Sequence, residues 1–430
     1  MIEKLRSFGR KIIPKPLFRA GQPVYHWLLA YAATLWYGFP SRKLTVIGVT
    51  GTNGKSTVVE LLHAILTEAG ESVASMSSIR FKINNKEETN ELKMTMPGRF
   101  QMQKFLNDAM AAGCKYVVLE VTSEGIKQFR NKGIKFFLAV LTNVTPEHIE
   151  SHGSFEEYRG AKAKLFYNTP NHIVNGEDAN IDYFVKIPAK NRIVYTKKDF
   201  PAGWHSTLLG DFNKENIVAA YHASRFLGTN PEKIKLAIEK FEGTPGRLEF
   251  IRREPFAVVV DYAHTPDALR KIYQTLRNYQ LPTTKASLSE AGRANYKLIC
   301  VLGAAGGGRD KWKRPEMGKI AAEFCDEIIL TNEDPYNENP LTILKDVESG
   351  FSQIQNSQHK ILNKYEARRV NCKLIVDRRE AIRAAISQAQ PSDVVVITGK
   401  GCEPWLMGPN GTKIPWDDRK TARDILRQAF

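Results

Sequence analysis

Hydrophobic residues along the chain alternate between two spacings, one typical of strands and one typical of helices. A β-branched run from Leu44 to Val49 precedes VVELLHAILTEAG, in which apolar residues recur every three or four positions. Strand-like runs such as KYVVLEV, FFLAVLTNV, HIVNG and RIVYT follow, and after Gly243 a second series runs from FAVVVDYA to VVVITGK. This alternation predicts α/β domains with mostly parallel sheets. We expect a central domain over residues 44–243 and a C-terminal, Rossmann-like domain over residues 244–430.

The loop after the first strand, GVTGTNGKST, has the composition of a phosphate-binding loop (P-loop). Gly51 and Gly54 let backbone N–H groups turn towards a polyphosphate at a helix N-terminus. Lys55 supplies a positive charge for the β- and γ-phosphates, and the Ser56 hydroxyl can ligate magnesium. Val49 replaces the first glycine of the strict G-x-x-x-x-G-K-[ST] pattern, so a plain glycine-rich turn is the alternative interpretation. We predict that the loop binds ATP with Mg²⁺. Its other nucleotide contacts are assigned to Thr52, Asn53 and Thr57.

Residues 1–43 do not continue the α/β pattern, and we expect them to form a short helical extension. A basic segment precedes VYHWLLAYAATLWYGF, which is apolar on nearly all sides but shorter than the about 20 residues of a membrane-spanning helix. Ala30-Tyr31-Ala32 resembles a signal-peptide cleavage site, yet cleavage there would send an ATP-binding strand to a compartment without ATP. Two interpretations remain: the helix packs on the next domain or a second subunit, or it lies in an anionic membrane interface.

Composition and charge set the outer bounds. The 430 residues, of which 42% are hydrophobic, suffice for two or three domains with substantial cores. The formal charge of +16 suggests an anionic partner, which could be nucleic acid, a membrane surface or a phosphorylated and carboxylated substrate. The five cysteines are scattered and contain no C-x-x-C pair, which argues against a disulfide framework or a zinc site and favours a reducing cytosol.

Several polar residues fall at the C-terminal ends of the predicted strands, where α/β sheets place their ligands. Glu120 ends KYVVLE, so its carboxylate can reach a magnesium ion held by Ser56. His148 follows LAVLTNVTPEH, and Lys162 lies shortly after it in the helical segment SFEEYRGAKAKLF. Each residue alone also has an ordinary explanation, because a single histidine is often structural and a lysine on a helix is usually solvated.

The order of the motifs carries more information than any one of them. Along the chain come GVTGTNGKST, EVTSEGIKQFR, LTNVTPEHIESHGSFEEYRGAKAKLF, LLGDFNKENIVAA, GTPGRLEFI, VDYAHTPDAL, GAAGGGRDKWKRPEMG and ITGKGCE. This series, from about Lys43 to the C-terminus, resembles the Mur ligases, and most closely the UDP-N-acetylmuramyl-tripeptide synthetases. The resemblance implies ATP-dependent formation of an amide bond, in peptidoglycan biosynthesis, between a muropeptide carboxylate and a free amino acid through an acyl phosphate.

The resemblance also assigns roles to the candidate residues. Lys55 and Ser56, with Glu120, would serve the magnesium ion of ATP, and His148 would serve a second magnesium ion. Lys162 matches the position of a carbamylated lysine, in which a neutral amine captures carbon dioxide and becomes an anionic metal ligand. Its neighbour Lys164 is expected to be solvated. Asn213, in LLGDFNKENIVAA, is assigned to the nucleotide.

The substrate contacts implied by the resemblance fall in two groups. The contacts assigned to the acceptor peptide are Thr95, Pro97, Thr122, Gln128 and Arg130, although Met96 and Glu124 depart from the usual threonine and histidine. The contacts assigned to the incoming amino acid are Arg309, Gly399 and Glu403, together with the specificity tetrapeptide Glu333-Asp334-Pro335-Tyr336. Relatives that use meso-diaminopimelate carry D-N-P-R in this tetrapeptide. Tyr336 therefore leaves the distal carboxylate of diaminopimelate without its arginine.

Three function hypotheses remain. The first is a muropeptide ligase that adds a third amino acid, although only about 43 residues stand where such an enzyme carries a separate UDP-binding domain, so the acceptor could instead be lipid-linked. The second is a ligase of the same superfamily acting on a poly-γ-glutamate or pseudomurein precursor. The third is a basic P-loop ATPase that binds nucleic acid, but no aromatic and basic RNA motif accompanies the charge, so we expect no nucleic acid partner. We expect a cytoplasmic enzyme. If the N-terminal helix lies in a membrane interface, the enzyme would be peripheral on the inner face of the membrane.

Overall fold

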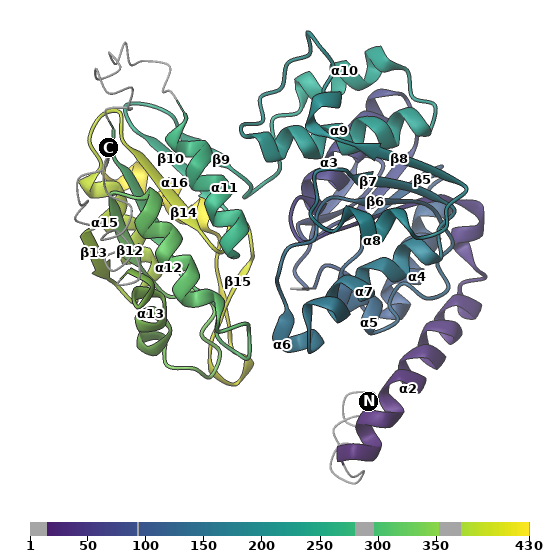
Figure 1. The fold of residues 1–430 in the computed structure, drawn as a ribbon, viewed down its shortest axis with the longest axis horizontal. Coiled ribbons are helices and arrows are strands. Elements are labelled where there is room, and N and C mark those ends of the chain that lie inside the picture. Colours follow the sequence, from purple (N-terminus) through teal and green to yellow (C-terminus); the bar gives the residue numbers. More distant parts are fainter. Residues whose placement is uncertain (1–14, 93, 280–295, 352–370, 430) are drawn as a thin grey trace. The chain divides into compact units, whose positions relative to one another are not determined.

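The computed structural model describes residues 15–92, 94–279, 296–351 and 371–429, with side chains from residue 21 onwards (Figure 1). The basic residues before position 15 lie outside the described residues. The chain forms two compact units, which we describe separately. The first comprises Met1–Val144, Glu156–Trp204 and Glu215–Ile238, and the second comprises Thr145–Phe155, His205–Lys214 and Glu239–Phe430. Residues 145–155, 205–214 and 239–243 of the expected central domain therefore group with the second unit.

A mostly parallel sheet forms the centre of the first unit. Its strands are β1 (Thr45–Thr50), β2 (Val73–Met76), β3 (Arg80–Ile83), β4 (Lys86–Thr89), β5 (Tyr116–Glu120), β6 (Phe136–Leu141), β7 (Asn171–Asn175) and β8 (Asn191–Tyr195). Within the described residues the order is β4-β3-β2-β5-β1-β6-β7-β8, with β3 and β4 added antiparallel at one edge. β5 and β7 are buried along their whole length, as expected for parallel strands covered on both faces.

Helices of the first unit connect these strands. They are α2 (Lys15–Trp36), η1 (Pro40–Lys43), α3 (Lys55–Glu68), α4 (Arg99–Ala111), α5 (Ser123–Lys127), α7 (Phe155–Tyr167), α8 (Ile181–Val185), η2 (Lys197–Asp199), α9 (Asp211–Phe226) and α10 (Pro231–Lys240). The predicted strand, loop and helix correspond to β1 and α3, and the predicted helical extension corresponds to α2, which packs on α4. Among the described helices, none is both long enough and apolar enough to cross a membrane.

The second unit is also an α/β layer structure. Its strands are β9 (Glu249–Arg252), β10 (Ala257–Asp261), β11 (Leu298–Leu302), β12 (Glu327–Leu330), β13 (Asn371–Leu374), β14 (Val394–Thr398), β15 (Trp405–Met407) and β16 (Lys413–Pro415). Its helices are α6 (Ile149–His152), α11 (Pro266–Arg277), α12 (Lys313–Phe324), α13 (Pro340–Glu348), α15 (Arg378–Gln388) and α16 (Asp418–Ala429), with the short turn η4 (Pro409–Gly411). The main described sheet has the order β13-β12-β11-β14-β10-β9, in which only β9 runs antiparallel.

Alternate residues of these strands enter two separate cores. Val259 on β10 packs in the core beneath α11, α12 and α13, whereas its neighbour Val258 packs in the core beneath α15 and α16. Figure 1 shows the two groups of helices on opposite faces of this sheet. Because both faces of the sheet are buried, the sequences of its strands are continuous apolar runs, such as VVVIT in β14. The predicted α/β class with mostly parallel sheets is confirmed in both units.

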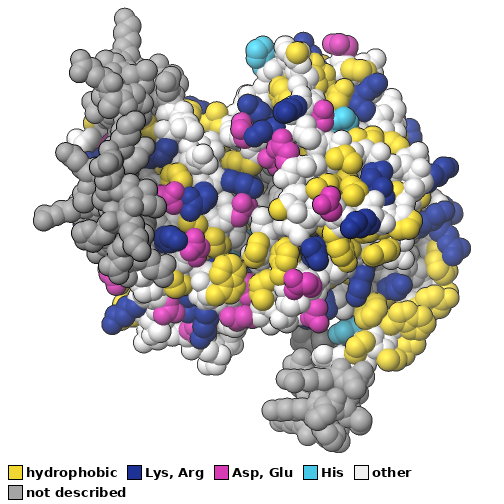
Figure 2. Space-filling model, in the orientation of Figure 1, with side chains coloured by type: hydrophobic (Ala, Val, Ile, Leu, Met, Phe, Trp, Pro, Cys, Tyr) yellow, Lys and Arg dark blue, Asp and Glu magenta, His cyan; other side chains and the backbone are white. Residues whose placement is uncertain are grey.

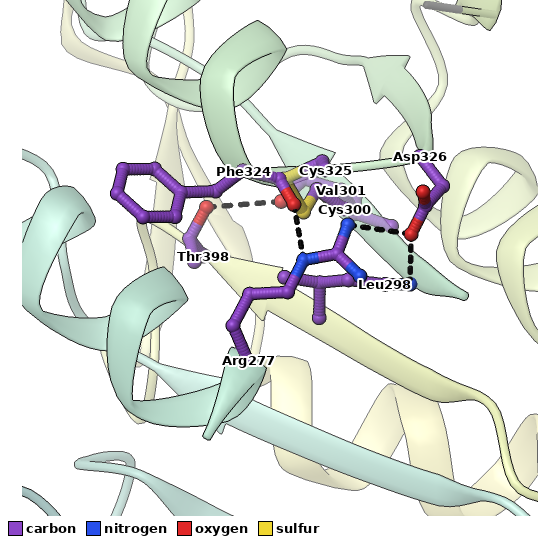
Figure 3. Close-up of a disulfide and its surroundings, with 8 residues drawn as sticks. All are labelled: Arg277, Leu298, Cys300, Val301, Phe324, Cys325, Asp326 and Thr398. Atoms are coloured by element: carbon purple, nitrogen blue, oxygen red, sulfur yellow. Dashed lines mark hydrogen bonds and ion pairs between the residues drawn. A yellow bond between two sulfur atoms is a disulfide. The ribbon is translucent and has the colours of Figure 1, made fainter. Parts of the chain in front are cut away.

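One expectation about the cysteines is wrong. Cys300 on β11 and Cys325, which follows α12, form a disulfide across a sequence separation of 25 residues (Figure 3). Arg277 Nε donates to the carbonyl oxygen of Phe324 at 2.5 Å, and Asp326 accepts a hydrogen bond from Leu298 N at 2.7 Å, so both cysteine segments are fixed by their neighbours. The sequence could not indicate this pair because β11 and the end of α12 become adjacent only in the folded sheet. The other three cysteines, Cys114, Cys372 and Cys402, are unpaired thiols.

Candidate functional site

Two glycines shape the loop between β1 and α3. Gly51 has a φ of 154° and Gly54 a φ of 84°, a backbone region that favours glycine. A Cβ atom on Gly51 would lie 1.9 Å from Thr142 Oγ1, and one on Gly54 would lie 2.2 Å from Asn216 Oδ1. Gly54, which has no side chain of its own, is the N-cap of the 14-residue helix α3. The loop therefore leaves a helix N-terminus available to a phosphate group.

Residues that follow β6 hold this loop in place, and sequence reasoning missed them. Asn143 Oδ1 accepts a hydrogen bond from Asn53 N at 2.9 Å, and Asn143 O accepts one from Thr52 N at 2.8 Å. Thr142 Oγ1 donates to Asn53 O at 2.6 Å. The signal that could have identified them is their place directly after the parallel strand β6, whose carboxyl end lies beside that of β1.

A hydroxyl, a carboxylate and an amine meet at the start of α3. Ser56 Oγ donates to Glu120 Oε2 at 2.9 Å, and Lys55 Nζ lies 4.0 Å from Glu120 Oε1 while donating to Thr52 O at 2.7 Å. Glu120 is almost fully buried at the end of β5. Ser78 was not predicted, yet its N–H donates to Glu120 Oε2 and its hydroxyl lies 2.9 Å from Ser56 Oγ. The structure thus brings together the three residues assigned to the ATP magnesium.

This group fits a magnesium ion bound together with a nucleotide. Hydroxyl and carboxylate oxygens are the ligands that Mg²⁺ prefers, and the ion usually keeps several waters and substrate phosphates. No cluster of three or more His, Cys, Asp or Glu side chains arranged to hold a metal occurs in the described parts of the chain. An ion held by Ser56 and Glu120 would therefore take its other ligands from phosphate and water.

Lys162 points to the same loop from α7. Its side chain is 2% exposed, its Nζ donates to Gly51 O at 2.7 Å and lies 4.3 Å from the centre of the Tyr158 ring. The Tyr158 hydroxyl in turn lies 3.0 Å from Thr52 Oγ1. Lys164, two residues further along the same helix, is exposed. Of the two lysines, Lys162 is therefore the one placed at the phosphate-binding loop.

The residues assigned to the acceptor peptide lie together in the first unit. Thr122 caps α5 by accepting a hydrogen bond from Gly125 N at 3.1 Å, and Arg130 donates to Gln128 Oε1 at 2.8 Å and to the carbonyl oxygen of Met96. Thr95 and Pro97 flank Met96, so the segments MTMPGR and EVTSEGIKQFR are joined at this residue. Burial lowers the pKa of Arg130 although the charge of Glu124 opposes this effect. Arg99 was not predicted, but it donates to the carbonyl oxygen of Gln128.

His148 lies in the second unit, whereas Lys162 lies in the first. The His148 backbone is left-handed, with a φ of 56°, and precedes α6. Its Nε2 lies 3.9 Å from Glu147 Oε2, and His264 Nε2 lies 3.2 Å from Glu147 Oε1. Burial acts to raise the pKa of Glu147, but His264, His148 and Lys313 outweigh it and hold that pKa well below its usual value. Glu147 is therefore an anion that lies beside both imidazoles.

Asn213 also lies in the second unit, where its side chain donates to Leu209 O at 2.8 Å. On α9, Asn216, three residues after Asn213 and in the first unit, lies beside the phosphate-binding loop, because its Oδ1 limits the space at Gly54. The predicted nucleotide role of Asn213 stays a prediction. Sequence reasoning missed Asn216 although the spacing in NKEN offered both residues.

Arg309 and the tetrapeptide are close together in the second unit. Arg309 hydrogen-bonds the Tyr336 hydroxyl and lies near the Tyr262 phenol and the charge of Glu403. Tyr262 donates to Glu403 Oε1 at 2.8 Å, and burial, followed by the charge of Glu403, raises the pKa of Tyr262 well above its usual value, so the phenol stays protonated. A guanidinium and a carboxylate at one site are suited to the carboxylate and the amino group of an amino acid.

Lys400 organises the acidic side of this site and was not predicted. It is fully buried, its Nζ donates to Asp334 Oδ1 at 3.0 Å, and it forms an ion pair with Glu403. Asp334 Oδ1 also accepts a hydrogen bond from Met407 N at 2.8 Å. A Cβ atom on Gly399 would lie 2.6 Å from Glu333 Oε2, a buried oxygen for which the described residues provide no hydrogen-bond donor. Lys400 thus lies among four predicted residues, Glu333, Asp334, Gly399 and Glu403. The G-K-G sequence could have indicated this lysine.

Comparison with known proteins agrees with this geometry. Residues 49–202 match the Mur ligase middle domain, and residues 246–401 match the Mur ligase, glutamate ligase domain. The UDP-N-acetylmuramoyl-L-alanyl-D-glutamate--2,6-diaminopimelate ligase of Syntrophomonas wolfei is 34% identical over 93% of this chain and 81% of its own length. The UDP-N-acetylmuramyl-tripeptide synthetase of Roseiflexus sp. is 32% identical over 97% of this chain and 84% of its own length.

Two solved structures are similar to this chain over most of its length. A structure of UDP-N-acetylmuramoyl-L-alanyl-D-glutamate--2,6-diaminopimelate ligase aligns with 90% of this chain and 78% of its own chain, with a TM-score of 0.54 and 30% identity. Mycobacterium tuberculosis folylpolyglutamate synthase, solved with ADP and AMPPCP, aligns with 87% of this chain and 92% of its own chain, with a TM-score of 0.66 and 18% identity, which shows a shared fold alone. On the matched domains and the relatives above 30% identity, the chain belongs to the Mur ligase family.

Proposed function

We propose that the protein is an ATP-dependent ligase that joins a free amino acid to the carboxylate of a muropeptide acceptor, of the UDP-N-acetylmuramoyl-dipeptide type, in peptidoglycan synthesis. The observation that carries the proposal is the meeting of Lys55, Ser56 and Glu120 at the N-terminus of α3. The names of the relatives support the acceptor, since they are ligases of UDP-N-acetylmuramoyl peptides. The cluster of Arg309, Tyr336 and Glu403 supports a free amino acid as the second substrate.

The chemistry needs two displacements. An oxygen of the acceptor carboxylate attacks the γ-phosphorus of ATP, the bond to the bridging oxygen of ADP breaks, and an acyl phosphate forms. The amine of the amino acid then attacks the acyl carbon, the bond to phosphate breaks, and the amine loses a proton to solvent. Lys55 lies where a cation offsets the negative charge that accumulates as the two anions meet. Magnesium held by Ser56 and Glu120 would add further positive charge on the phosphates.

We further propose that Lys162 works as a carbamate. Burial favours its neutral amine, which can form an N–C bond with carbon dioxide and release one proton to water, leaving an anionic pair of oxygens for a second magnesium ion. The almost complete burial of Lys162 at the carbonyl oxygen of Gly51 supports this proposal. The exposed neighbour Lys164 has no comparable surroundings.

We place the reaction in the cytoplasm, because the enzyme consumes ATP. The Cys300–Cys325 disulfide is unusual for that compartment, but both cysteines are fully buried, which limits access of thiol reductants. A peripheral position at the membrane would depend on the helix α2 and not on the ATP-binding site.

Product mass tests the proposed function directly. Purified protein would be incubated with ATP, magnesium, UDP-N-acetylmuramoyl dipeptide and a panel of amino acids, with Lys55→Met as the inactive control. We expect phosphate release that needs both the peptide and an amino acid, and a product heavier than the dipeptide by one amino acid minus water. Turnover with only a poly-γ-glutamate or pseudomurein precursor would show that the acceptor is wrong. ATP hydrolysis stimulated by nucleic acid alone would overturn the ligase assignment.

A further inference from the structure

The helix α2 has two faces of opposite character. Within residues 21–36, which contain no Asp, Glu, Lys or Arg, the side chains of Ala30, Ala33 and Thr34 are buried. They are small, so this face approaches its neighbours closely: a Cβ atom on Gly133 would lie 1.9 Å from Thr34 Oγ1. Just after the helix, Ser41 Oγ donates a hydrogen bond to Gly133 O at 3.3 Å, so the segment that follows α2 contacts the same residue. The small residues therefore fix the direction in which the other face of α2 points.

That other face consists of large apolar and aromatic side chains that are exposed. Val24, Leu28, Tyr31 and Leu35 follow the i, i+4, i+7, i+11 spacing of one helical stripe, and each is between 49% and 60% exposed. Three further exposed side chains flank the stripe, namely Tyr25, Trp27 and Trp36, of which Trp36 is 79% exposed. Figure 2 shows hydrophobic side chains gathered over α2. A contiguous apolar surface of this kind on a soluble unit marks an interaction site.

The charges around α2 indicate the chemistry of the partner. Residues 1–43 contain eight basic side chains and one acidic side chain, a net charge of +7 out of +16 for the whole chain. Arg42 and Lys43, just after the helix, are exposed. A second copy of this chain seated on the same face would bring two such segments together and oppose pairing. An anionic surface would instead attract them, and tryptophan and tyrosine side chains favour the interface between headgroups and acyl chains.

We propose that the exposed face of α2 docks the protein on an anionic lipid bilayer, with the helix lying in the plane of the headgroups. The helix is too short in apolar length to span the bilayer, so its contact is confined to one leaflet. Val24, Leu28, Tyr31 and Leu35 insert, and the exposed side chains of Arg42 and Lys43 after the helix pair with lipid phosphates. Docking would hold the ligase beside any acceptor that is attached to lipid, but it is independent of turnover.

Flotation with vesicles tests this surface without using ligase activity. The full-length protein is mixed with phosphatidylcholine vesicles that contain or lack phosphatidylglycerol, at low and high salt. The test variant is Leu28→Glu with Leu35→Glu, both 54% exposed, and the matched control is Leu341→Glu with Ile414→Glu, 48% and 55% exposed in the second unit. Leucine and glutamate have similar helix propensity, so the change at α2 does not weaken the helix itself. Circular dichroism and ATP turnover in solution check that both variants fold.

We expect wild type and control to float with anionic vesicles, to float less with neutral ones, and to lose binding as salt rises. The α2 variant should bind at least about tenfold more weakly, since two leucines no longer enter the apolar region. Binding of the α2 variant equal to that of wild type would overturn the proposal. A wild-type dimer that the α2 variant converts to a monomer, with no flotation by either, would also overturn it and assign the face to a second copy.

Discussion

The Arg309 guanidinium donates a hydrogen bond to the Tyr336 hydroxyl, at the last position of the tetrapeptide Glu333-Asp334-Pro335-Tyr336. The ring of Tyr336 also lies over the turn at Gly307, where a Cβ atom would be 2.5 Å from the Tyr336 ring. Tyr336 is thus held in place by its neighbours, and it offers a phenol in place of a cation to the side chain of the incoming amino acid.

We predict that the wild-type protein prefers lysine, ornithine or another amino acid without a distal carboxylate over meso-diaminopimelate. Burying that carboxylate without a charge-assisted partner costs roughly 1.5–3 kcal/mol, or about tenfold to a hundredfold in selectivity. Comparing kcat/KM for lysine, ornithine, alanine and diaminopimelate measures this preference. Tyr336→Arg should shift it towards diaminopimelate, and Tyr336→Phe should leave the order of substrates unchanged. A wild-type preference of tenfold or more for diaminopimelate would refute this interpretation of the tetrapeptide.

Lys162→Ala should lower turnover by about a hundredfold or more, because the proposed carbamate, and with it an anionic ligand for a second magnesium ion, would be lost. ATP binding should persist, since Lys55 and the N-terminus of α3 are unchanged, and short carboxylic acids should restore part of the rate. The measurements are steady-state turnover with and without added acetate, and nucleotide binding by calorimetry. Lys164→Ala, on the exposed side of the same helix, is the control and should stay close to wild type. Near wild-type turnover of Lys162→Ala would remove the carbamate from the mechanism.

The stability of the first unit should depend on pH through His63. Burial, helped by the charge of Lys82 and opposed by that of Glu60, lowers the pKa of this histidine to about 4. Between pH 6.5 and pH 4 the unfolded chain therefore binds a proton that the folded chain does not, so stability falls as pH falls, by about 3 kcal/mol in all. Urea unfolding at a series of pH values should show this slope in wild type and in the exposed control His205→Gln, but not in His63→Gln. The same slope in His63→Gln would assign it to other groups.

The Cys300–Cys325 disulfide should stabilise the second unit by about 3 kcal/mol, a value expected for a loop closed over 25 residues. Replacing both cysteines by alanine should lower the urea midpoint of unfolding, whereas Cys372→Ala, at a half-buried thiol, should change it little. Peptide mass analysis without reductant checks that the bond is present. Two free thiols in the purified protein, or equal midpoints, would contradict the assignment.

The predicted site residues that the structure brings together share one property. Ser56 and Glu120 meet because the carboxyl ends of adjacent parallel strands lie at one edge of a sheet, and an alternating pattern predicts that arrangement. The antiparallel strands β3 and β4 were missed, because RFKI alternates polar and apolar residues over only four positions and the exposed KEET contains no apolar residue. Lys400 and the Cys300–Cys325 pair depend on contacts between distant segments, for which a single sequence carries no periodic signal.

The assignment of Thr145–Phe155 to the second unit has a consequence for how the protein can be divided. Asp310 accepts hydrogen bonds from the backbone N–H groups of Ile149 and Glu150, and Glu147 lies beside His264, so this short stretch completes the second unit although the chain leaves and returns to the first unit around it. A gene fragment that starts at residue 244 would encode a sheet deprived of these partners. The two units are interleaved in the polypeptide, and neither can be excised by a single cut.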